Sequence, residues 1–230
     1  MEFNNTLANE YEKGIRRTLP SYDAMLRLTK AFYQSTLQEQ ASFLVVGSGS
    51  GNEIIQLAEH RPDWSFVGID PSEAMLKIAE NRLQSLPNDI SLLQGTILTA
   101  SVPAMHFDAA SCILVLHFIE SYEEKLATLK EIAQRLKSGA PFVLVSKYGQ
   151  LNSAETELQF DLWRAYWQQH TKLSSSEIAT MEQSIRSLSF MREEAIVTLL
   201  QQAGFSQPSR FFATTLFGGW ICYKEQLESL

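Results

Sequence analysis

The segment that decides the fold is FLVVGSGSGNE, residues 43–53. Its first half has the composition of a buried strand, and helical spacing of apolar residues begins directly after three glycines, Gly47, Gly49 and Gly51. A glycine turn between a strand and a helix lets the main chain approach a ligand, and the helix N-terminus offers free N–H groups. The segment therefore predicts a ligand-binding turn at the end of the first strand.

Short apolar runs alternate with helical patterns on both sides of this turn. The pattern predicts strands over 42–46, 65–70, 90–95, 107–116 and 140–148, and helices over 52–60, 72–86 and 122–137. Ser72 is expected to be the N-cap of the second of these helices, and Gly139 the C′ residue of the third. Such alternation with continuous apolar strands favours a parallel sheet that is buried on both faces.

The pattern changes after Tyr148. Helices are predicted over 155–170, 174–190 and 192–205, the last of them ended by Gly204. Two strands follow, over 209–217 and 219–226, and Gly218–Gly219 between them indicates an antiparallel hairpin turn. The first forty residues are helical in pattern and end in a helix over 22–37.

Composition and charge limit the classes of function. The chain has 230 residues, 45% of them hydrophobic, and a net charge of −7. This length favours one domain, and the acidic balance disfavours nucleic-acid binding. The Cys and His spacings predict no metal site, and the two cysteines are expected to be buried and reduced. We find no signal peptide, and the longest apolar run, 109–119, is too short to span a bilayer, so the sequence predicts a cytoplasmic protein.

An aspartate follows the glycine turn at the end of the second predicted strand. Asp70 ends the second predicted strand, 19 residues after Gly51, and a carboxylate there can accept hydrogen bonds from both hydroxyls of a ribose. The glycine pattern is G-x-G-x-G, with Asn52 where a dinucleotide fingerprint needs its last glycine. The sequence therefore indicates an adenosine-type ligand and argues against NAD.

The order of these motifs resembles the class I S-adenosylmethionine-dependent methyltransferases. The resemblance is carried by FLVVGSGSG, FVGIDPSEAML, LLQG, FDAASCILVLHFIE and LKSGAPFVLV, and by the FFATTLF–GG–WICYKE hairpin. It implies an α/β fold: a Rossmann-like seven-stranded, mostly parallel sheet with an antiparallel last strand, plus a helical cap. The single domain would comprise an N-terminal helical cap (1–40), a cofactor-binding core (41–148), a helical cap insertion (149–191), and a last helix with the terminal hairpin (192–230).

The resemblance also implies which residues hold the cofactor, S-adenosyl-L-methionine. Gly47 and Gly49 would lie under its methionine part, and Asp70 would bind the ribose hydroxyls. The other residues expected at the cofactor are Tyr22, Ser48, Gly51, Pro71, Met75, Thr96, Ile97 and Leu114, of which Pro71, Met75, Thr96 and Ile97 would lie near the adenine.

Two positions depart from the family pattern. The acid usual two residues before the first glycine is Val45 here, and the acid usual after the third strand is Thr96. The first of these acids helps to hold the ammonium group of the cofactor. Glu53 could supply that negative charge, although a first-turn acid is also favoured by the helix dipole alone.

The acceptor side is less defined by the sequence. His117 follows the fourth strand and is the candidate general base, with a structural histidine bonded to the backbone as the alternative. Tyr11, Arg16 and Tyr148 are candidate substrate residues, with aromatic packing and a solvated arginine as their alternatives. Only some acceptors need a base, because methyl transfer from a sulfonium depends mainly on alignment.

Three functions remain open at this point. The first is methyl transfer to a small, fairly apolar molecule. The second is an activity similar to the carboxy-S-adenosylmethionine synthases, the subgroup that residues 15–26 and the helices after Tyr148 most resemble. That subgroup reads the extra carboxylate with an arginine, whereas ungapped matching places Glu182 there, one turn before Arg186. The third is a cofactor-binding module without catalysis. A homodimer is left open.

Overall fold

The computed structural model of the protein describes residues 14–226. Its helices are α2 (Tyr22–Thr36), α3 (Asn52–Ala58), α4 (Glu73–Leu83), η1 (Leu116–Phe118), α5 (Tyr122–Arg135), α6 (Ala154–His170), α7 (Ser175–Arg186) and α8 (Glu193–Gln202). Its strands are β1 (Ala41–Val46), β2 (Trp64–Asp70), β3 (Ile90–Gln94), β4 (Ala109–Ile113), β5 (Pro141–Lys147), β6 (Ser209–Thr214) and β7 (Phe217–Tyr223).

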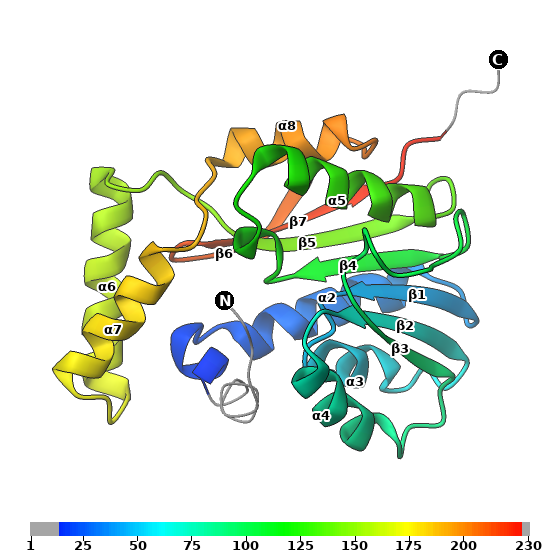
Figure 1. Cartoon of the computed structure of the whole chain (residues 1–230), viewed down its shortest axis with the longest axis horizontal. Coiled ribbons are helices and arrows are strands. Elements are labelled where there is room, and N and C mark those ends of the chain that lie inside the picture. The colour runs from blue at the N-terminus through cyan, green and yellow to red at the C-terminus, as the bar shows by residue number, and fades with distance from the viewer. Residues whose placement is uncertain (1–13, 227–230) are drawn as a thin grey trace.

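All of these strands form one sheet, in the order β3-β2-β1-β4-β5-β7-β6 (Figure 1). The pairs from β3 to β5 are parallel, and β7 runs antiparallel to both β5 and β6. This confirms the predicted fold class. The chain reverses its direction across the sheet between β1 and β4, and open α/β sheets bind ligands in the crevice at such a switch point.

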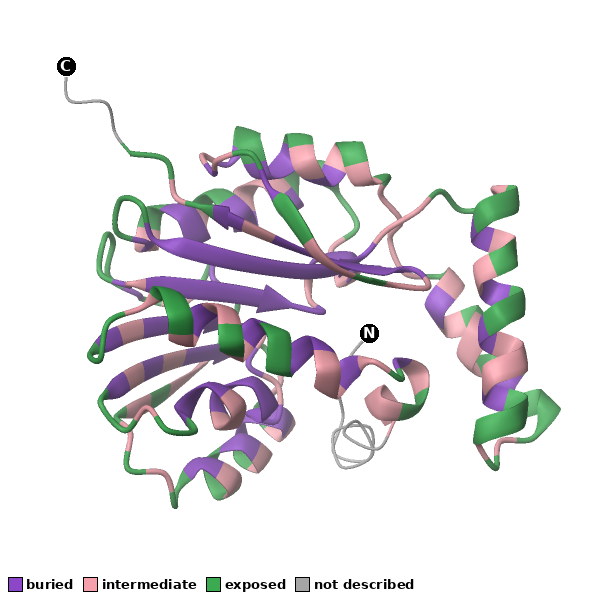
Figure 2. Ribbon diagram, turned by 180° about the vertical axis from the view of Figure 1, so that it is seen from behind, coloured by how far each residue is buried: buried purple, intermediate pink, exposed green. Residues whose placement is uncertain are grey.

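The sheet is buried on both faces because the strand residues alternate between two cores. On β1, Phe43 and Val45 belong to the core shared with α2 and α3, whereas Leu44 and Val46 belong to the core shared with α5 and α8. All four side chains are at most 5% exposed. The central strands are accordingly buried along their length in Figure 2. Continuous apolar strands are therefore required here, as the sequence pattern indicated.

The hairpin between β6 and β7 differs from the prediction. The turn lies at Thr215–Leu216, and Gly218 and Gly219 lie inside β7. A Cβ atom at Gly218 would come within 2.6 Å of the Trp220 ring, and one at Gly219 within 2.7 Å of the Phe211 ring. These glycines therefore make room for aromatic rings that cross the sheet, and do not form the turn.

Two further boundaries differ from the prediction. Strand β4 ends at Ile113, short of the predicted 116, because Leu114 has a left-handed φ of +61° and η1 begins at Leu116. Helix α5 ends at Arg135 with Leu136 as its C-cap, so Gly139 is a turn residue before β5 and not the C′ residue. The predicted Ser72 N-cap is confirmed, since its hydroxyl accepts from the Met75 N–H.

Helices α6 and α7 stand beyond the carboxyl ends of the parallel strands, apart from the helices that cover the sheet (Figure 1). They pair through Arg164 on α6, whose guanidinium binds Glu182 on α7 at 2.7 Å, and through Arg186 on α7, which binds Glu157 on α6 at 2.6 Å. Within residues 14–226, no helix has the length and apolar character needed to cross a membrane.

Candidate functional site

The glycine turn leaves β1 and reaches α3 through left-handed backbone. Gly47 has a φ of +78° and Gly49 a φ of +49°. A Cβ atom at Gly47 would lie 2.0 Å from Cγ2 of Val115, in the loop after β4. The close approach of these two loops therefore needs a residue without a side chain at position 47.

Asp70 ends β2 beside this turn. Its Oδ2 accepts from the Gly49 N–H and its Oδ1 from the Ser72 N–H, both at 2.9 Å. The residue is 9% exposed, and burial raises the pKa of its carboxyl while these two hydrogen bonds oppose the shift. The two bonds fix the carboxylate at the crevice and tie the glycine turn to the start of α4.

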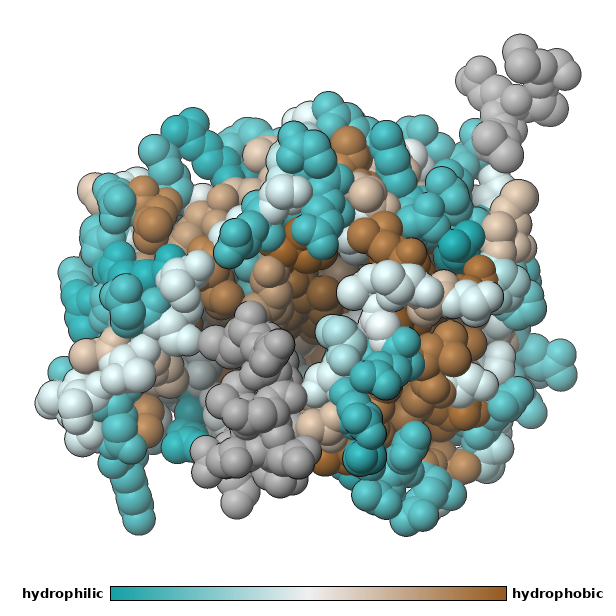
Figure 3. All heavy atoms as spheres, viewed as in Figure 1, coloured by the Kyte–Doolittle hydropathy of each residue, from teal (hydrophilic) through white to brown (hydrophobic). Residues whose placement is uncertain are grey.

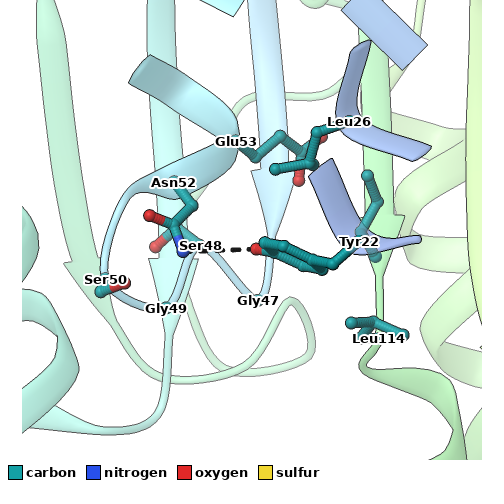
Figure 4. A pocket seen from close by; sticks show the side chains of 10 residues that line it. Tyr22, Leu26, Gly47, Ser48, Gly49, Ser50, Asn52, Glu53 and Leu114 are labelled. Carbon is teal, nitrogen blue, oxygen red and sulfur yellow. Dashed lines mark hydrogen bonds between the residues drawn. The ribbon is translucent and has the colours of Figure 1, made fainter. Parts of the chain in front are cut away.

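A small hollow of about 30 Å³, here called the glycine hollow, lies between the turn, α2 and the end of β4 (Figure 4). A hollow of this size holds roughly one water molecule. Its lining comprises Tyr22, Leu26, Gly47, Ser48, Gly49, Ser50, Asn52, Glu53, Ile113 and Leu114. Two buried polar atoms in this lining, Ser48 Oγ and Glu53 Oε1, have no hydrogen-bond partner within the described part of the chain. Bare backbone and unpartnered polar atoms suit a polar ligand group, because such atoms are costly to bury unpaired.

Tyr22 reaches the glycine hollow from α2, as predicted for a cofactor residue. Its hydroxyl oxygen lies 3.3 Å from Asn52 Nδ2, which donates to it, and burial raises the pKa of the phenol to about 12. Tyr22 therefore stays neutral and closes the hollow on the side of α2.

The residues expected near the adenine differ in burial. Met75 is buried, and its methyl group would be 3.3 Å from a Cβ atom at Gly49. Pro71 and Thr96 are exposed, whereas Ile97 is 1% exposed within the core beside α5. Gly51 does not line the glycine hollow; it is the N-cap of α3 in left-handed conformation, where a Cβ atom would crowd Leu83 of α4.

A second and much larger cavity, here called the apolar cavity, has a volume of about 680 Å³. Its lining comprises Gly14, Ile15, Arg17, Thr18, Leu114, His117, Phe118, Leu173, Ser176, Glu177, Thr180, Met181, Ser184, Ile185, Leu188 and Phe217. These residues come from the N-terminal segment, α7 and the ends of β4 and β7. The face shown in Figure 3 is hollowed near its middle, with mostly apolar atoms at the base. Leu114 lines both this cavity and the glycine hollow.

His117 lies in η1 at the wall of the apolar cavity and is 4% exposed. Its Nδ1 accepts from the Lys147 N–H at 3.3 Å, so the ring proton is on Nε2. Burial lowers the pKa of the imidazole to about 3, and the charges of Lys147 and Lys125 act in the same direction. The ring is therefore neutral near pH 7 and can donate a hydrogen bond from Nε2.

The side chain of Lys147 fastens the end of α7 to the end of β5. Its Nζ donates to the carbonyl oxygens of Ile185 at 2.6 Å and Leu188 at 3.0 Å, and lies 3.4 Å from the centre of the Phe190 ring. Burial lowers the pKa of this amine to about 7. Ile185 and Leu188 line the apolar cavity, so Lys147 holds one of its walls in place.

Of the predicted substrate residues, the two that the structure describes, Arg16 and Tyr148, do not line the apolar cavity. The Arg16 guanidinium is bound to Asp23 at 3.0 Å and lies 5.5 Å from the centre of the Tyr22 ring, whereas the neighbouring Arg17 lines the cavity. The Tyr148 ring packs edge-on against Trp220. Tyr11 lies outside the described residues. The sequence offered no signal to separate Arg17 from Arg16, since adjacent residues in one helix differ only in the direction they face.

Glu53 is the site residue whose position the sequence left most open. It is 7% exposed and projects from α3 into the glycine hollow (Figure 4). A carboxylate in the first turn of a helix is ordinary at the surface, so only its burial marks it as part of the site.

Comparisons with known proteins agree with this geometry. A family model described as a methyltransferase domain matches residues 44–142. Among curated proteins, the chain is 25% identical over 226 residues to a carboxy-S-adenosyl-L-methionine synthase of Nautilia profundicola, covering 97% of this chain and 94% of that protein. It is 27% identical over 234 residues to carboxy-S-adenosyl-L-methionine synthase 1 of Yersinia pseudotuberculosis, covering 96% and 92%.

Among solved structures, the fold is similar to magnesium protoporphyrin IX methyltransferase of Synechocystis with bound SAH. The TM-score is 0.70 at 14% identity, over 97% of this chain and 96% of that one. The chain therefore shares the fold of a solved methyltransferase, and that fold places the polar glycine hollow beside a separate apolar cavity.

Proposed function

This chain belongs to the class I S-adenosylmethionine-dependent methyltransferases, and we propose that it transfers a methyl group from that cofactor to a small, largely apolar acceptor. The observation that carries the proposal is that Leu114 lines both hollows. The polar glycine hollow suits the amino-acid end of the cofactor, and the apolar cavity suits an acceptor. Their shared wall is where a methyl group would pass between them.

The cofactor would supply a methyl group already activated by a positively charged sulfur. This chain's residues then have to bind, orient and exclude water. Asp70, whose carboxylate is held by the Gly49 and Ser72 N–H groups, would accept the ribose hydroxyls. The main chain at Gly47 and Gly49 would lie against the methionine part. Alignment of this kind supplies much of the rate gain in a displacement reaction.

His117 is better suited to donating a hydrogen bond than to accepting a proton. Its Nδ1 is occupied by the Lys147 N–H, and a pKa of about 3 makes the ring a weak base. We therefore propose that Nε2–H orients an oxygen or nitrogen of the acceptor in the apolar cavity. This replaces the expectation of a general base with that of a donor.

A small molecule suits the cavity better than a macromolecule. The cavity of about 680 Å³ falls within the range of small-molecule pockets, and the net charge of −7 disfavours a nucleic acid. Cys112 and Cys222 are both free and buried, which fits a reducing compartment. We propose the cytoplasm on this ground.

Replacing Asp70 with alanine tests the placement of the cofactor. We expect binding of S-adenosylhomocysteine to weaken by about 1 to 3 kcal/mol, because hydrogen bonds to a charged partner are lost. Isothermal titration calorimetry measures this change, and circular dichroism checks the fold. Asp63→Ala, an exposed position before β2, is the control with the same change in charge and should bind as the wild type does. Equal affinity in Asp70→Ala and wild type would show that the ribose lies elsewhere.

An activity similar to carboxy-S-adenosylmethionine synthesis is the second candidate, favoured by the names of the curated relatives. Glu182 does not line the apolar cavity. Its carboxylate is bound by Arg164 at 2.7 Å and by Arg186 at 2.9 Å, between α6 and α7. Both arginines are thus engaged in pairing the two helices, and neither lines the apolar cavity. Arg17 is a cation at the wall of that cavity.

Identifying the ligand that co-purifies with the protein would distinguish between these two functions. We expect the protein to release S-adenosylmethionine or its demethylated product when it is denatured, and mass spectrometry identifies the released compound. The synthase activity predicts a derivative that is heavier by one carboxyl group. Recovery of that derivative, and its loss in Arg17→Ala, would move the assignment to the second candidate.

A further inference from the structure

Glu53 is a buried carboxylate whose charged form, among the described residues, only the Ser111 hydroxyl stabilises. Its side chain extends from the first turn of α3 into the glycine hollow, close to Gly47 and Tyr22 (Figure 4). The residue is 7% exposed, and Oε1 makes no hydrogen bond to any residue from 14 to 226. A carboxylate buried in this way is unfavourable unless a cation or several donors reach it, so its position calls for a ligand.

The carboxylate of Glu53 lies beside the position from which the family's usual acid is missing. Val45 of β1 faces the core that β1 shares with α2 and α3, and its register partner on β4 is Ser111. The Ser111 hydroxyl is close enough to Glu53 to lower the pKa of its carboxyl, although Ser111 Oγ and Glu53 Oε1 have no hydrogen-bond partner. Glu53 therefore reaches from α3 to the strand ends where an acid at position 45 would lie.

Among residues 14–226, no cation acts on the pKa of the Glu53 carboxyl. Burial raises the pKa of Tyr22 and Tyr33, on α2, and of Cys112, on β4, and the charge of Glu53 acts in the same direction, so all three groups are neutral near pH 7. Burial raises the pKa of Glu53 itself to about 7. The site thus holds a carboxyl group that is poised to ionise when a cation enters.

We propose that Glu53 binds the ammonium group of the cofactor's methionine part and replaces the acid that is absent at position 45. This inference rests on the proposed function, because the ammonium group comes with S-adenosylmethionine. The chemistry is a charge-assisted hydrogen bond between an ammonium donor and a carboxylate in a dry hollow, which is stronger than the same contact in water.

Proton release follows from this assignment. Below a pH of about 7 the carboxyl of the ligand-free protein carries a proton, and an ammonium ion is bound best by the ionised form. Binding of an ammonium-bearing ligand therefore releases a proton below pH 7. Its affinity rises with pH up to about 7 and levels off above, as linkage requires.

The test compares two ligands that share the adenosine and thioether parts. S-adenosylhomocysteine carries the ammonium group, whereas 5′-methylthioadenosine lacks the amino-acid tail. At pH 7.5 we expect Glu53→Gln to weaken binding of the first about 10- to 100-fold, the range for a lost charged hydrogen bond. Binding of the second should stay unchanged. Glu59→Gln, an acid at the end of the same helix with a side chain 51% exposed, is the control and should bind both ligands as the wild type does.

A second measurement needs no variant. Calorimetry of the wild type in buffers of different ionisation enthalpy, at pH 6, should detect proton release with S-adenosylhomocysteine and none with 5′-methylthioadenosine. Equal losses for both ligands in Glu53→Gln, or no proton release in the wild type, would overturn the role of Glu53. Failure of the wild type to bind either ligand would instead overturn the proposed function, so the two failures are distinguishable.

Discussion

Replacing Gly47 with alanine is expected to abolish measurable cofactor binding and to lower the free energy of unfolding by about 2 to 5 kcal/mol. Two effects combine. The backbone φ of +78° is unfavourable for any residue with a Cβ atom, and that atom would lie 2.0 Å from Val115 Cγ2. The loops after β1 and β4 would have to separate, and the glycine hollow lies between them. Chemical denaturation and calorimetry with S-adenosylhomocysteine measure the two losses.

Gly139→Ala is the matched control for this variant. Gly139 has nearly the same left-handed φ, +76°, but among residues 14–226 a Cβ atom there meets nothing closer than Gln226 at 4.0 Å. We expect a loss of about 1 to 2 kcal/mol from backbone strain alone, with cofactor binding retained. If Gly47→Ala were no worse than Gly139→Ala in both measurements, the packing of Val115 against the turn would not matter.

The second large effect is a loss of stability in acid that depends on His117. The folded protein holds this imidazole neutral down to a pH of about 3, whereas the unfolded chain binds a proton below 6.5. The unfolded state therefore binds more protons between these values, and stability falls as the pH falls through this window. Each pH unit in it is worth about 1.4 kcal/mol, so we expect a contribution of about 3 kcal/mol by pH 4.

His117→Asn removes the titration while leaving an oxygen that can accept from the Lys147 N–H. Between pH 7 and pH 4, the wild type should therefore lose about 3 kcal/mol more unfolding free energy than this variant does. Urea denaturation at each pH measures it. His106→Asn, the same change at an exposed position, is the matched control. A constant offset between His117→Asn and wild type across this range would contradict the neutral, buried imidazole.

Glu53 acts on stability in the opposite direction to His117. The pKa of its carboxyl is about 7 in the folded protein, against an ordinary value of 4.5, so the folded state holds an extra proton between these values. Stability from this group rises as the pH falls from 7 to 4.5. The wild-type profile contains both effects together with those of other shifted groups such as Lys147 and Asp70, and the difference between each variant and the wild type isolates one of them.

The order of strands and helices can be predicted from the sequence because each element has its own local sequence pattern. Strands were continuous apolar runs, helices had their own spacing, and Ser72 capped α4 as its position predicted. Errors arose where tertiary contacts overrode such signals. Gly218 and Gly219 resembled a hairpin turn, yet rings of Trp220 and Phe211 require them inside β7. The apolar run through Leu116 hid the end of β4, since only the left-handed backbone at Leu114 ends the strand.

The candidate site was predicted in part for the same reason. The glycines and Asp70 are motif residues, and their places in one crevice follow from the parallel sheet. Such motifs do not predict the direction in which a side chain points from a helix. Arg17 lines the apolar cavity where Arg16 was expected, and Glu53 is buried where a surface acid would be ordinary. The residues of α7 at the cavity depend on a helix placement that Lys147 and the ion pairs to α6 determine.

Leu114 has a consequence for the range of molecules the protein can accept. One isobutyl group forms the partition between two chambers of very different size, about 30 Å³ and about 680 Å³. Its left-handed backbone fixes the side chain there. With the cofactor and the acceptor in the two chambers as proposed, the thickness of that partition would set how far a nucleophile must protrude from its parent molecule to meet the sulfur-bound carbon. A trimmed residue at this position would therefore broaden the choice of acceptors, and a bulkier one would narrow it to those with a slender, projecting atom.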